Sequence, residues 1–429
     1  MKKLSLIAVS LVWLTGNSFA QVNTEFRPAS AQVPEQPAPG NPPVMGISQP
    51  PPLSSLNTPT PEIPQGFAPD VPSLGYQEAR MWFTADYLLW WYRPQNPPTL
   101  AVRVPDGLAG AAAPATTIPL YPNDGEIDYG IASGIRLSAG GYFTDIFGVD
   151  ASYFRLEQMS ESGSFFSGST GLPSIARPYF RAGAPTTTPI VLYSSLPGPG
   201  GYIGGTAIVS ESELFGYDAN LLVRGFALVA DQTDYQIGYR YFSLEESIVI
   251  ADTSIFPGGA RLDVRDSYRV RNQFYGGQLG TRARFFGNYG LGFDVGAKLA
   301  LGTVAQRAEL IGFNTVTTPA GAVSSLPGGL YVQPTNAGTH ERNQFAAMGE
   351  LNLNLTYQLT EYLVVSAGYS LIYLTNAARP GQLIDPTIND ANVPYIAGAP
   401  ANTTNAPLFR WQDQTFWTQG FNVGFSIFY

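Results

Sequence analysis

Apolar and polar positions alternate with a period of two over most of the chain beyond Met81. In the stretch MGELNLNLTYQL (348–359), leucine or tyrosine fills every second position from Leu351 onward, and mostly polar residues stand between them. A period of two is the pattern of a β-strand whose two faces meet different surroundings. Helical spacing is not sustained anywhere. Ten such runs stand out, at about 81–92, 130–142, 147–157, 213–227, 233–245, 270–286, 289–303, 344–359, 362–375 and 415–429.

The lengths and connections of these runs predict a membrane barrel. Most of the runs reach the roughly 9–11 residues that a tilted strand needs to cross a bilayer. Short turns, near Thr144, within 229–233, at Gly287 and at Thr360, alternate with long connections. The long connections lie near 93–129, 158–212, 246–269, 304–343 and 376–414. We therefore predict an all-β, transmembrane, up-and-down antiparallel β-barrel of about ten strands, or twelve, since 177–195 or 246–268 could extend or add hairpins. Its short turns are periplasmic and its long loops face outward.

The type of charged residue favours a closed barrel over a soluble sandwich. A sandwich would expose its polar face to water, where lysine is common, yet Lys298 is the only lysine beyond position 3. Inside a barrel, buried acids must pair, and the planar arginine fork suits carboxylates. We expect the apolar faces to meet lipid and the polar faces to line a lumen. The predicted lumen charge network is Asp86, Arg136, Asp150, Asp218, Arg224, Arg240, Arg282, Arg284, Asp294, Lys298 and Glu350.

Aromatic residues gather near the ends of the runs. Rings with a polar tip prefer the boundary between membrane and water; the alternative is the ordinary enrichment of aromatics in strands. The predicted interface aromatics are Tyr87, Trp91, Tyr357, Tyr373 and Trp417. The final alternating run places Phe425, Ile427 and Tyr429 on one face, and we predict that the barrel-assembly machinery reads them as a C-terminal signal.

The residues before the first run predict secretion and disorder. Two lysines, an apolar stretch over 4–14 and Ser18-Phe19-Ala20 form the pattern of a signal peptide (1–20) cleaved after Ala20, with an uncleaved anchor as the alternative. Residues 21–78 contain 14 prolines and few large apolar groups, which predicts a disordered periplasmic segment. That segment would be a passive leader or a tether. The barrel is expected over 80–429.

Composition limits the chemistry that the chain can carry. There is no cysteine, and the net charge of −9 argues against nucleic-acid binding. His340 is the only histidine, and its spacing from the loop acids Asp385, Asp390 and Asp413 specifies no catalytic dyad. The acids at 124–128 could hold calcium but lack the EF-hand pattern. We expect no enzyme activity, no metal and no cofactor.

Several stretches resemble the beta-barrel porin-7 family, outer-membrane barrels found mainly in planctomycete-type bacteria. They are WFTADYLLWWYRPQNPPTLAV (82–102), GIRLSAGGYFTDIFGVDASYFRLE (134–157), DYQIGYRYFSLEE (234–246), NQFYGGQLGTRARF (272–285) continuing to GAKLALGTVAQ (296–306), GELNLNLTYQLTEYLVVSAGYSLIYLTNAARPGQLID (349–385) and FWTQGFNVGFSIFY (416–429). The resemblance implies an outer-membrane barrel in a Gram-negative cell envelope, and it implies little chemistry.

The expected function follows from the strand number. Eight strands leave an interior filled by side chains, whereas 16–18 leave an aqueous channel. Ten strands with eleven lumen charges predict a porin-like or envelope-structural protein with a narrow or side-chain-plugged polar lumen. The alternatives are a surface-binding or adhesive protein that uses its long loops, such as 158–212, and an outer-membrane hydrolase. The expected partners are outer-membrane lipid, the assembly machinery, and small solutes or a surface partner.

Overall fold

The computed structural model describes residues 81–106, 117–184, 190–225, 230–396 and 403–429. The chain divides into two units, Met1–Pro69 and Asp70–Tyr429, and every described residue belongs to the second. The predicted signal peptide and proline-rich segment lie outside the described residues.

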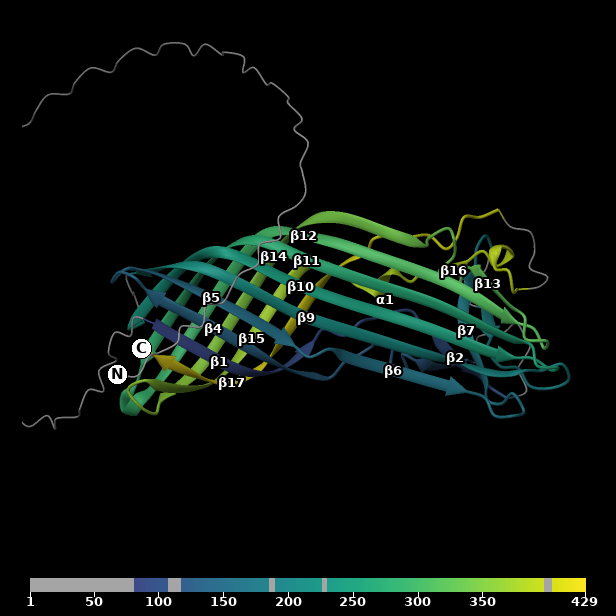
Figure 1. Ribbon diagram of the computed structural model, residues 1–429, viewed down its shortest axis with the longest axis horizontal. Coiled ribbons are helices and arrows are strands. Elements are labelled where there is room, and N and C mark those ends of the chain that lie inside the picture. Colours follow the sequence, from purple (N-terminus) through teal and green to yellow (C-terminus); the bar gives the residue numbers. More distant parts are fainter. Residues whose placement is uncertain (1–80, 107–116, 185–189, 226–229, 397–402) are drawn as a thin grey trace, which may run out of the picture. The chain divides into compact units, whose positions relative to one another are not determined.

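Within the described ranges, ten strands form a closed antiparallel ring in which each strand pairs with its neighbours in chain order (Figure 1). They are β1 (Met81–Tyr92), β4 (Ile131–Tyr142), β5 (Phe147–Leu156), β9 (Ile203–Gly225), β10 (Gln232–Ile255), β11 (Arg261–Phe286), β12 (Leu291–Thr317), β14 (Gly338–Gln358), β15 (Leu363–Ala378) and β17 (Asp413–Phe428). Pairing of β17 with β1 closes the ring. The predicted barrel is confirmed. Two more strands, β6 (Met159–Phe166) and β13 (Val323–Pro327), pair with β9 and β12 outside the ring.

Two of the short hairpins are closed by the same threonine turn. The Thr144 hydroxyl accepts a hydrogen bond from the backbone N–H of Phe147 at 2.8 Å, and the Thr360 hydroxyl accepts one from Leu363 at 3.1 Å. The hairpin between β11 and β12 instead turns through a 3₁₀ segment, Asn288–Gly290. A side chain that bonds nearby backbone groups favours a turn over a continuing strand. These threonines therefore end the preceding strands.

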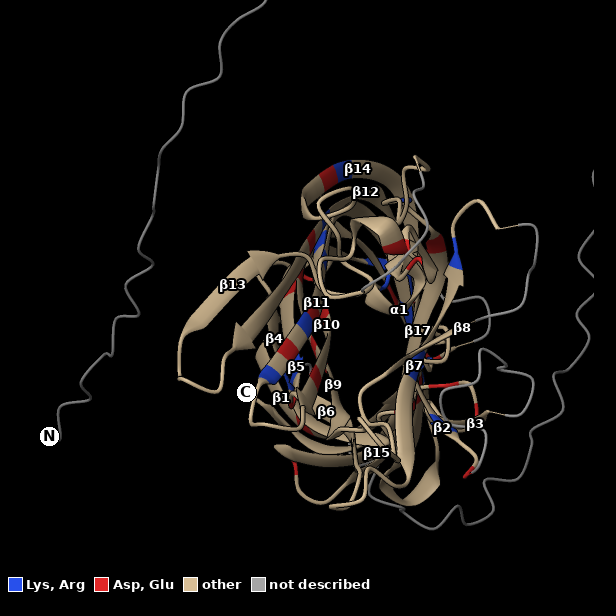
Figure 2. Ribbon diagram, turned by 90° about the vertical axis from the view of Figure 1, so that its right-hand side faces the viewer, with Lys and Arg blue, Asp and Glu red and all other residues tan. Residues whose placement is uncertain are grey.

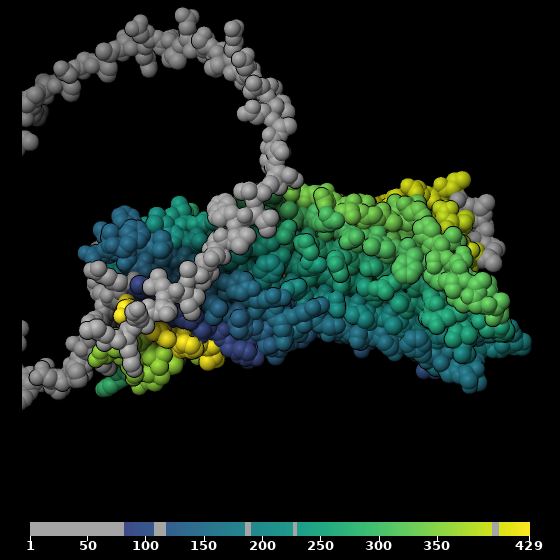
Figure 3. All heavy atoms as spheres, in the orientation of Figure 1, coloured from purple at the N-terminus to yellow at the C-terminus, as the bar shows by residue number. Residues whose placement is uncertain are grey.

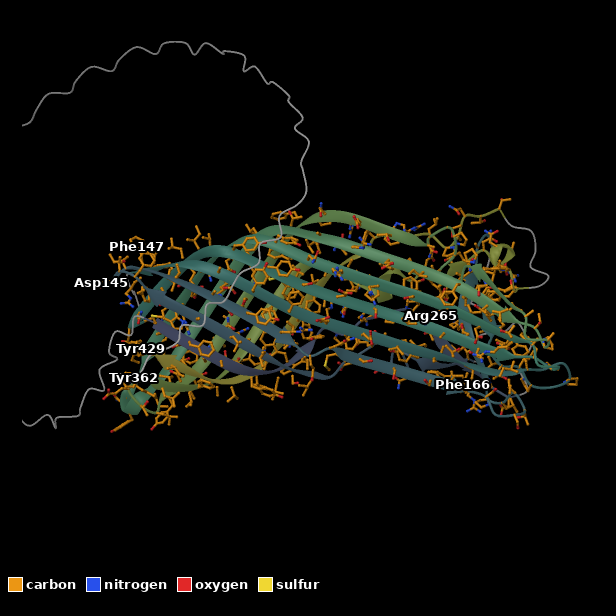
Figure 4. All side chains as sticks on the ribbon, in the orientation of Figure 1. Asp145, Phe147, Phe166, Arg265, Tyr362 and Tyr429 are labelled. Carbon is orange, nitrogen blue, oxygen red and sulfur yellow. The ribbon has the colours of Figure 1, made fainter. Side chains whose placement is uncertain are left out.

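The two ends of the ring differ in their connections. Asp145, Tyr362 and Tyr429 lie together at one end (Figure 4), which we call the turn end. The opposite end, which we call the loop end, carries the longer connections. Within the part of the chain that the structure describes, no helix combines the length and apolarity that crossing a membrane requires.

Five ring strands continue well past the loop ends of the others. β9, β10, β11, β12 and β14 are 21 to 27 residues long, against 10 to 16 for the other five. Their outer portions, together with β6, form what we call the extension (159–166, 203–213, 243–255, 261–273, 305–317 and 338–343). The space-filling view shows it continuous with the ring (Figure 3). Most residues of the predicted loops at 246–269 and 304–343 are strand, so the loop prediction is wrong for them. The alternative that 246–268 extends a hairpin is confirmed by the pairing of β10 with β11.

The physical reason is that the alternation inverts where the extension begins. In the ring part of β10, the outward residues Tyr235 and Ile237 are exposed and apolar. Further along the same strand, the inward residues Ile248 and Ile250 are fully buried, and outward positions carry polar residues such as Glu245. An apolar outward face suits lipid and a polar outward face suits water, so the side that carries the apolar residues changes along this strand.

A small second sheet lies against the inner face of the extension. Its strands are β3 (Ile118–Tyr121), β2 (Ala101–Val104), β7 (Ser174–Arg181), β8 (Ile190–Tyr193) and β16 (Thr387–Ile388). Short helical turns, α1 (Pro380–Leu383) and η3 (Asp390–Asn392), follow β15. Buried residues of the second sheet and of these turns, such as Tyr179 and Leu383, share one apolar core with Ile248 and Tyr268 of the extension.

Candidate functional site

The interior of the ring brings many of the predicted lumen charges together. The Glu350 carboxylate contacts the guanidinium of Arg240 and lies 3.6 Å from that of Arg136. The Lys298 ammonium lies 2.8 Å from the Asp218 carboxylate. Charges removed from water need such partners. These five side chains therefore form one ionic cluster that links β4, β9, β10, β12 and β14.

A second cluster lies nearer the turn end. Arg284 is 2.7 Å from Asp234, Arg224 is 4.0 Å from the same carboxylate, and Arg282 is 3.4 Å from Asp294. Asp234 was absent from the predicted set. Asp234 is six positions before the predicted Arg240 and so lies on the same face of β10, which could have identified it as a lumen residue.

The remaining two predicted acids have polar surroundings. Asp150 accepts hydrogen bonds from the side-chain amides of Asn220 at 2.7 Å and Gln236 at 3.4 Å. Asp86 lies opposite Arg136 on β4 and Gly424 on β17 in the strand register. A Cβ atom on Gly424 would collide with the Asp86 carboxylate, so this glycine leaves the space that the acid occupies.

The charged side chains line a cavity that contains about 900 Å³ of empty space, part of it open to solvent. Asp86, Asp150, Lys298 and Glu350 are among its lining residues. It shares lining residues with a smaller cavity that reaches Phe428, near the turn end. The polar interior therefore extends toward the turn end.

On the loop side of the charges, the interior is filled by apolar rings. Ring centroids are 5.5 Å apart for Trp90 and Phe154, 6.3 Å for Phe154 and Phe242, and 6.1 Å for Phe242 and Phe416. The Arg136 guanidinium lies 5.1 Å from the Trp90 ring, where the charged zone meets this apolar zone. We call the full set the apolar layer: Leu88, Trp90, Tyr92, Phe154, Leu156, Phe242, Leu244, Phe274, Met348, Ile372, Leu374 and Phe416, all at most 4% exposed.

Next to the apolar layer, three segments are joined by one buried arginine. Arg379 donates to the Glu246 carboxylate from Nε at 2.9 Å and from Nη2 at 2.6 Å. Its Nη1 donates to the backbone carbonyls of Arg93 and Pro94, both at 2.8 Å. The Gln95 amide also donates to Glu246, at 3.2 Å. Arg379 and Glu246 are fully buried. We call Gln95, Glu246 and Arg379 the latch.

A second buried arginine ties the small sheet to the extension. Arg177 on β7 lies 2.7 Å from Asp252 on β10 and 2.8 Å from Asp266 on β11, with its guanidinium 4.2 Å from the Tyr331 ring centroid. Burial alone would lower the pKa of Arg177, but the two carboxylates outweigh it and raise that pKa well above the ordinary value. The arginine therefore stays charged.

Outward tyrosines mark the border between the ring and the extension. Tyr153, Tyr217, Tyr241 and Tyr275 stand side by side on β5, β9, β10 and β11 in the register, and we call them the aromatic row. The ring centroids of Tyr217 and Tyr241 are 4.9 Å apart, and those of Tyr241 and Tyr275 are 5.2 Å apart. Sequence analysis did not single out these four residues, although each holds an outward position at the end of an apolar run.

The predicted interface aromatics take up different places on the ring. Trp91 packs against rings of β15 and β17 near the outer end of β1, and Tyr373 stands opposite Trp417 in the register. Tyr357 is exposed near the turn end of β14. Tyr87 is exposed near the middle of β1, five residues from its outer end. In the C-terminal segment, Phe425, Ile427 and Tyr429 are all exposed on the outward face.

The residues that were considered for catalysis have other contacts. His340 stacks on Phe409 with ring centroids 3.6 Å apart. Asp390 bonds Arg181, Asp413 bonds Arg342, and Asp385 accepts two backbone N–H groups. The described ranges contain no group of three or more histidine or acidic side chains placed to hold a metal ion.

A ten-stranded ring with an apolar outer face and paired charges inside is the architecture of a barrel that sits in lipid. A family model described as "Putative beta barrel porin-7 (BBP7)" matches residues 82–429. The chain belongs to this family. The resemblance noted in the sequence is thus confirmed, and this porin-7 family member is an outer-membrane β-barrel protein.

Solved outer-membrane proteins are similar to this family member at low identity. The outer membrane protease OmpT of Escherichia coli is 9% identical, with 82% of this chain and 98% of that chain covered and a TM-score of 0.34. A FadL homologue of Pseudomonas aeruginosa is 8% identical, with 82% and 90% covered and a TM-score of 0.21. The TodX deltaS2S3 mutant, a monoaromatic hydrocarbon channel, is 12% identical, with 82% and 91% covered and a TM-score of 0.22. No curated protein matches the sequence.

Proposed function

We propose that this barrel is an outer-membrane anchor closed to diffusing solutes, and that it displays the extension at the cell surface. The observation that carries the proposal is the apolar layer. Its twelve residues come from β1, β5, β10, β11, β14, β15 and β17, so they fill the interior from strands on all sides of the ring. A passage for polar solutes needs water, and a packed apolar layer excludes it.

The width of the ring supports the same conclusion. Ten strands lie close to the eight that enclose only side chains and far from the 16–18 of open porins. On the loop side, Arg379 of the latch lies over the Phe416 ring of the apolar layer, 5.6 Å from its centroid. In this proposal the apolar layer ends the charged cavity, which continues toward the turn end through the smaller cavity that reaches Phe428. The turn end is the periplasmic side in this orientation.

The outward surface supports the placement of the extension outside the membrane. Tyr275 in the aromatic row and Phe285 near the turn end are ten positions apart on β11. At a rise of about 3.3 Å per residue and a tilt of about 40°, they span roughly 25 Å along the barrel axis, the height of an outer-membrane apolar band. Beyond Tyr275, the outward positions of β11 carry Gln273, Arg271 and Arg269.

The proposal includes no catalytic role. It retains surface binding as the second candidate function, because the extension and the small sheet make a packed structure whose apolar core is continuous with the apolar layer. Such a structure suits contact with a partner better than a set of pore loops does. Removing the β13 hairpin tip, 318–322, from the purified protein and comparing its binding to cell-wall and surface preparations would test this candidate.

Single-channel recording in planar bilayers tests the closed barrel. We expect the wild-type protein to insert without stable conductance steps. A triple variant with Trp90, Phe242 and Phe416 each changed to alanine removes three rings of the apolar layer and should produce steps. A matched variant with the lipid-facing Phe83, Phe345 and Phe421 changed to alanine should stay silent. Stable nanosiemens steps from the wild-type protein would refute the proposal.

A further inference from the structure

Four charged residues form an outward row just beyond the aromatic row. In the register, Glu245, Arg271, Arg307 and Glu341 stand side by side on β10, β11, β12 and β14. Arg271 lies 2.7 Å from Glu245, and Arg307 lies 2.8 Å from Glu341. The two arginines at the centre are directly opposed, and like charges so placed repel each other. An anion bound between them would offset that repulsion.

The two arginines border a hollow on the outward surface. It contains about 800 Å³ of space, much of it open to solvent, and its lining includes Arg271, Arg307, Gln273 and Asn343. Ala305 lies between the two amide side chains in the register and gives the hollow a low floor. The hollow therefore combines two cations with two amide side chains, and the Glu341 carboxylate that pairs with Arg307 also lines it. The Gln273 amide donates one hydrogen bond to Tyr241 and keeps a second N–H.

Each of the two arginines keeps N–H donors beyond those that contact its glutamate. The Arg271 and Arg307 side chains are 46% and 54% exposed, and each guanidinium carries five N–H donors, more than a single carboxylate accepts. Figure 2, which colours the two signs of charge, shows acidic and basic segments next to each other on β14. The flanking glutamates hold the guanidiniums at the edges of the hollow and leave donors available.

The position of the hollow on the barrel indicates which class of anion binds in it. Its floor residue, Ala305, is two positions along β12 from Thr303, which pairs with Tyr275 of the aromatic row and with Phe345. Phe345 is 67% exposed, and the apolar outward face of the ring begins there. A molecule in the hollow would have an apolar surface directly below its anionic group. Free phosphate has nothing to place on that surface, whereas a lipid has acyl chains.

We propose that this hollow binds the phosphate of an anionic lipid in the outer leaflet, with Arg271 and Arg307 as the phosphate ligands and Gln273 and Asn343 beside them. Arginine matches phosphate oxygens through paired N–H donors. The proposal depends on the membrane placement of the barrel and not on whether the lumen is closed.

Native mass spectrometry of the full-length protein released from detergent micelles tests the site. The probes are phosphatidylglycerol and phosphatidylcholine, added separately. We expect tighter retention of phosphatidylglycerol, weakened by on the order of tenfold or more in the Arg271→Gln/Arg307→Gln variant, since each juxtamembrane arginine contributes about fivefold. The control is Arg103→Gln/Arg261→Gln, which removes two exposed, paired arginines that lie on the small sheet and at the tip of the extension and should bind like wild type. Heat-modifiable gel mobility checks that each barrel is folded.

A variant of opposite sign separates binding from a structural ion-pair row. Glu245→Gln/Glu341→Gln frees both guanidiniums and should strengthen phosphatidylglycerol binding, whereas a structural role predicts no gain. The proposal is overturned if the control variant loses as much binding as the Arg271/Arg307 variant, or if the glutamine substitutions at 245 and 341 weaken binding. Complete displacement of the lipid by millimolar inorganic phosphate would also overturn it, since that would assign the hollow to a free anion.

Discussion

Replacing Arg379 by methionine tests whether the latch holds the loop end of the barrel closed. The change keeps most of the side-chain volume and removes four hydrogen bonds, two to Glu246 and two to backbone carbonyls. Glu246 would then keep only the Gln95 amide, at 3.2 Å. Removing one partner of a buried ion pair costs about 3–5 kcal/mol. We expect the free energy of unfolding to fall by about 4 kcal/mol.

The paired variant Arg379→Met/Glu246→Leu separates the ion pair from the rest of the site. Because an apolar replacement leaves no buried charge, most of the lost stability should return, and the double variant should lie within about 2 kcal/mol of the wild-type protein. Denaturant unfolding in detergent gives the free energies, and hydrogen exchange at the backbone amides of Arg93 and Gln95 reports local opening. Arg307→Met, which breaks an exposed pair, is the control and should cost less than about 1 kcal/mol.

Two results would refute this reasoning. The first is a loss below about 1 kcal/mol in Arg379→Met, comparable with an exposed pair. The second is strict additivity, in which the double variant loses the sum of the two single losses, since groups that contact each other should show a coupling free energy.

Three further predictions concern the outward face, the interior packing and the second buried arginine. Leu279→Arg, midway along the lipid-facing part of β11, should lower the free energy of unfolding by about 2–4 kcal/mol. Val323→Arg on the exposed β13 should change that free energy little. Equal losses for the two variants in denaturant titrations would argue against a lipid-facing belt. Gly424→Ala should lower the yield of folded barrel on refolding gels, because the added Cβ would collide with Asp86. Gly277→Ala, whose Cβ would meet open space, should leave the yield unchanged. A larger loss of yield in Gly277→Ala than in Gly424→Ala would contradict the interior packing. Arg177→Met should make the extension more sensitive to protease while the ring stays heat-modifiable. The reason is that the change leaves the buried carboxylates of Asp252 and Asp266 without their cation. Unchanged digestion would count against a role of Arg177 in holding the small sheet to the extension.

The ring could be predicted from sequence because lipid imposes one strong rule on it. Every outward position must be apolar, so stretches such as Leu351 to Tyr357 show a contrast that survives without any tertiary information. Along β10 the extension follows the opposite rule, with the apolar residues Ile248 and Ile250 pointing inward, whereas on β12 the outward Ile311 and Phe313 are apolar and exposed. Where the two rules meet, both faces of a strand carry mixed residues, and the pattern was interpreted as a loop.

The contacts of the interior could be predicted only in part. The alternation of side chains along a strand placed Lys298 and Glu350 on the inward face, because that alternation depends only on neighbouring positions in the sequence. The latch joins Arg379 to Glu246 across 133 positions, and Arg379 follows the end of a strand, where alternation gives no direction. Trp90 is four positions from the predicted lumen residue Asp86 and so lies on the same face of its strand, but the packing of its ring against Phe154 depends on ring closure and register.

β9 to β12 and β14 pass the aromatic row without any break in their backbone hydrogen bonding. A pull applied at the far tip of one of these strands would act parallel to the strand and would load many of these bonds at the same time. Strands loaded in this way resist sliding far better than hairpins that are peeled apart one bond after another. A cell held by this part of the molecule could therefore transmit tension directly to its envelope, with no flexible hinge to yield first.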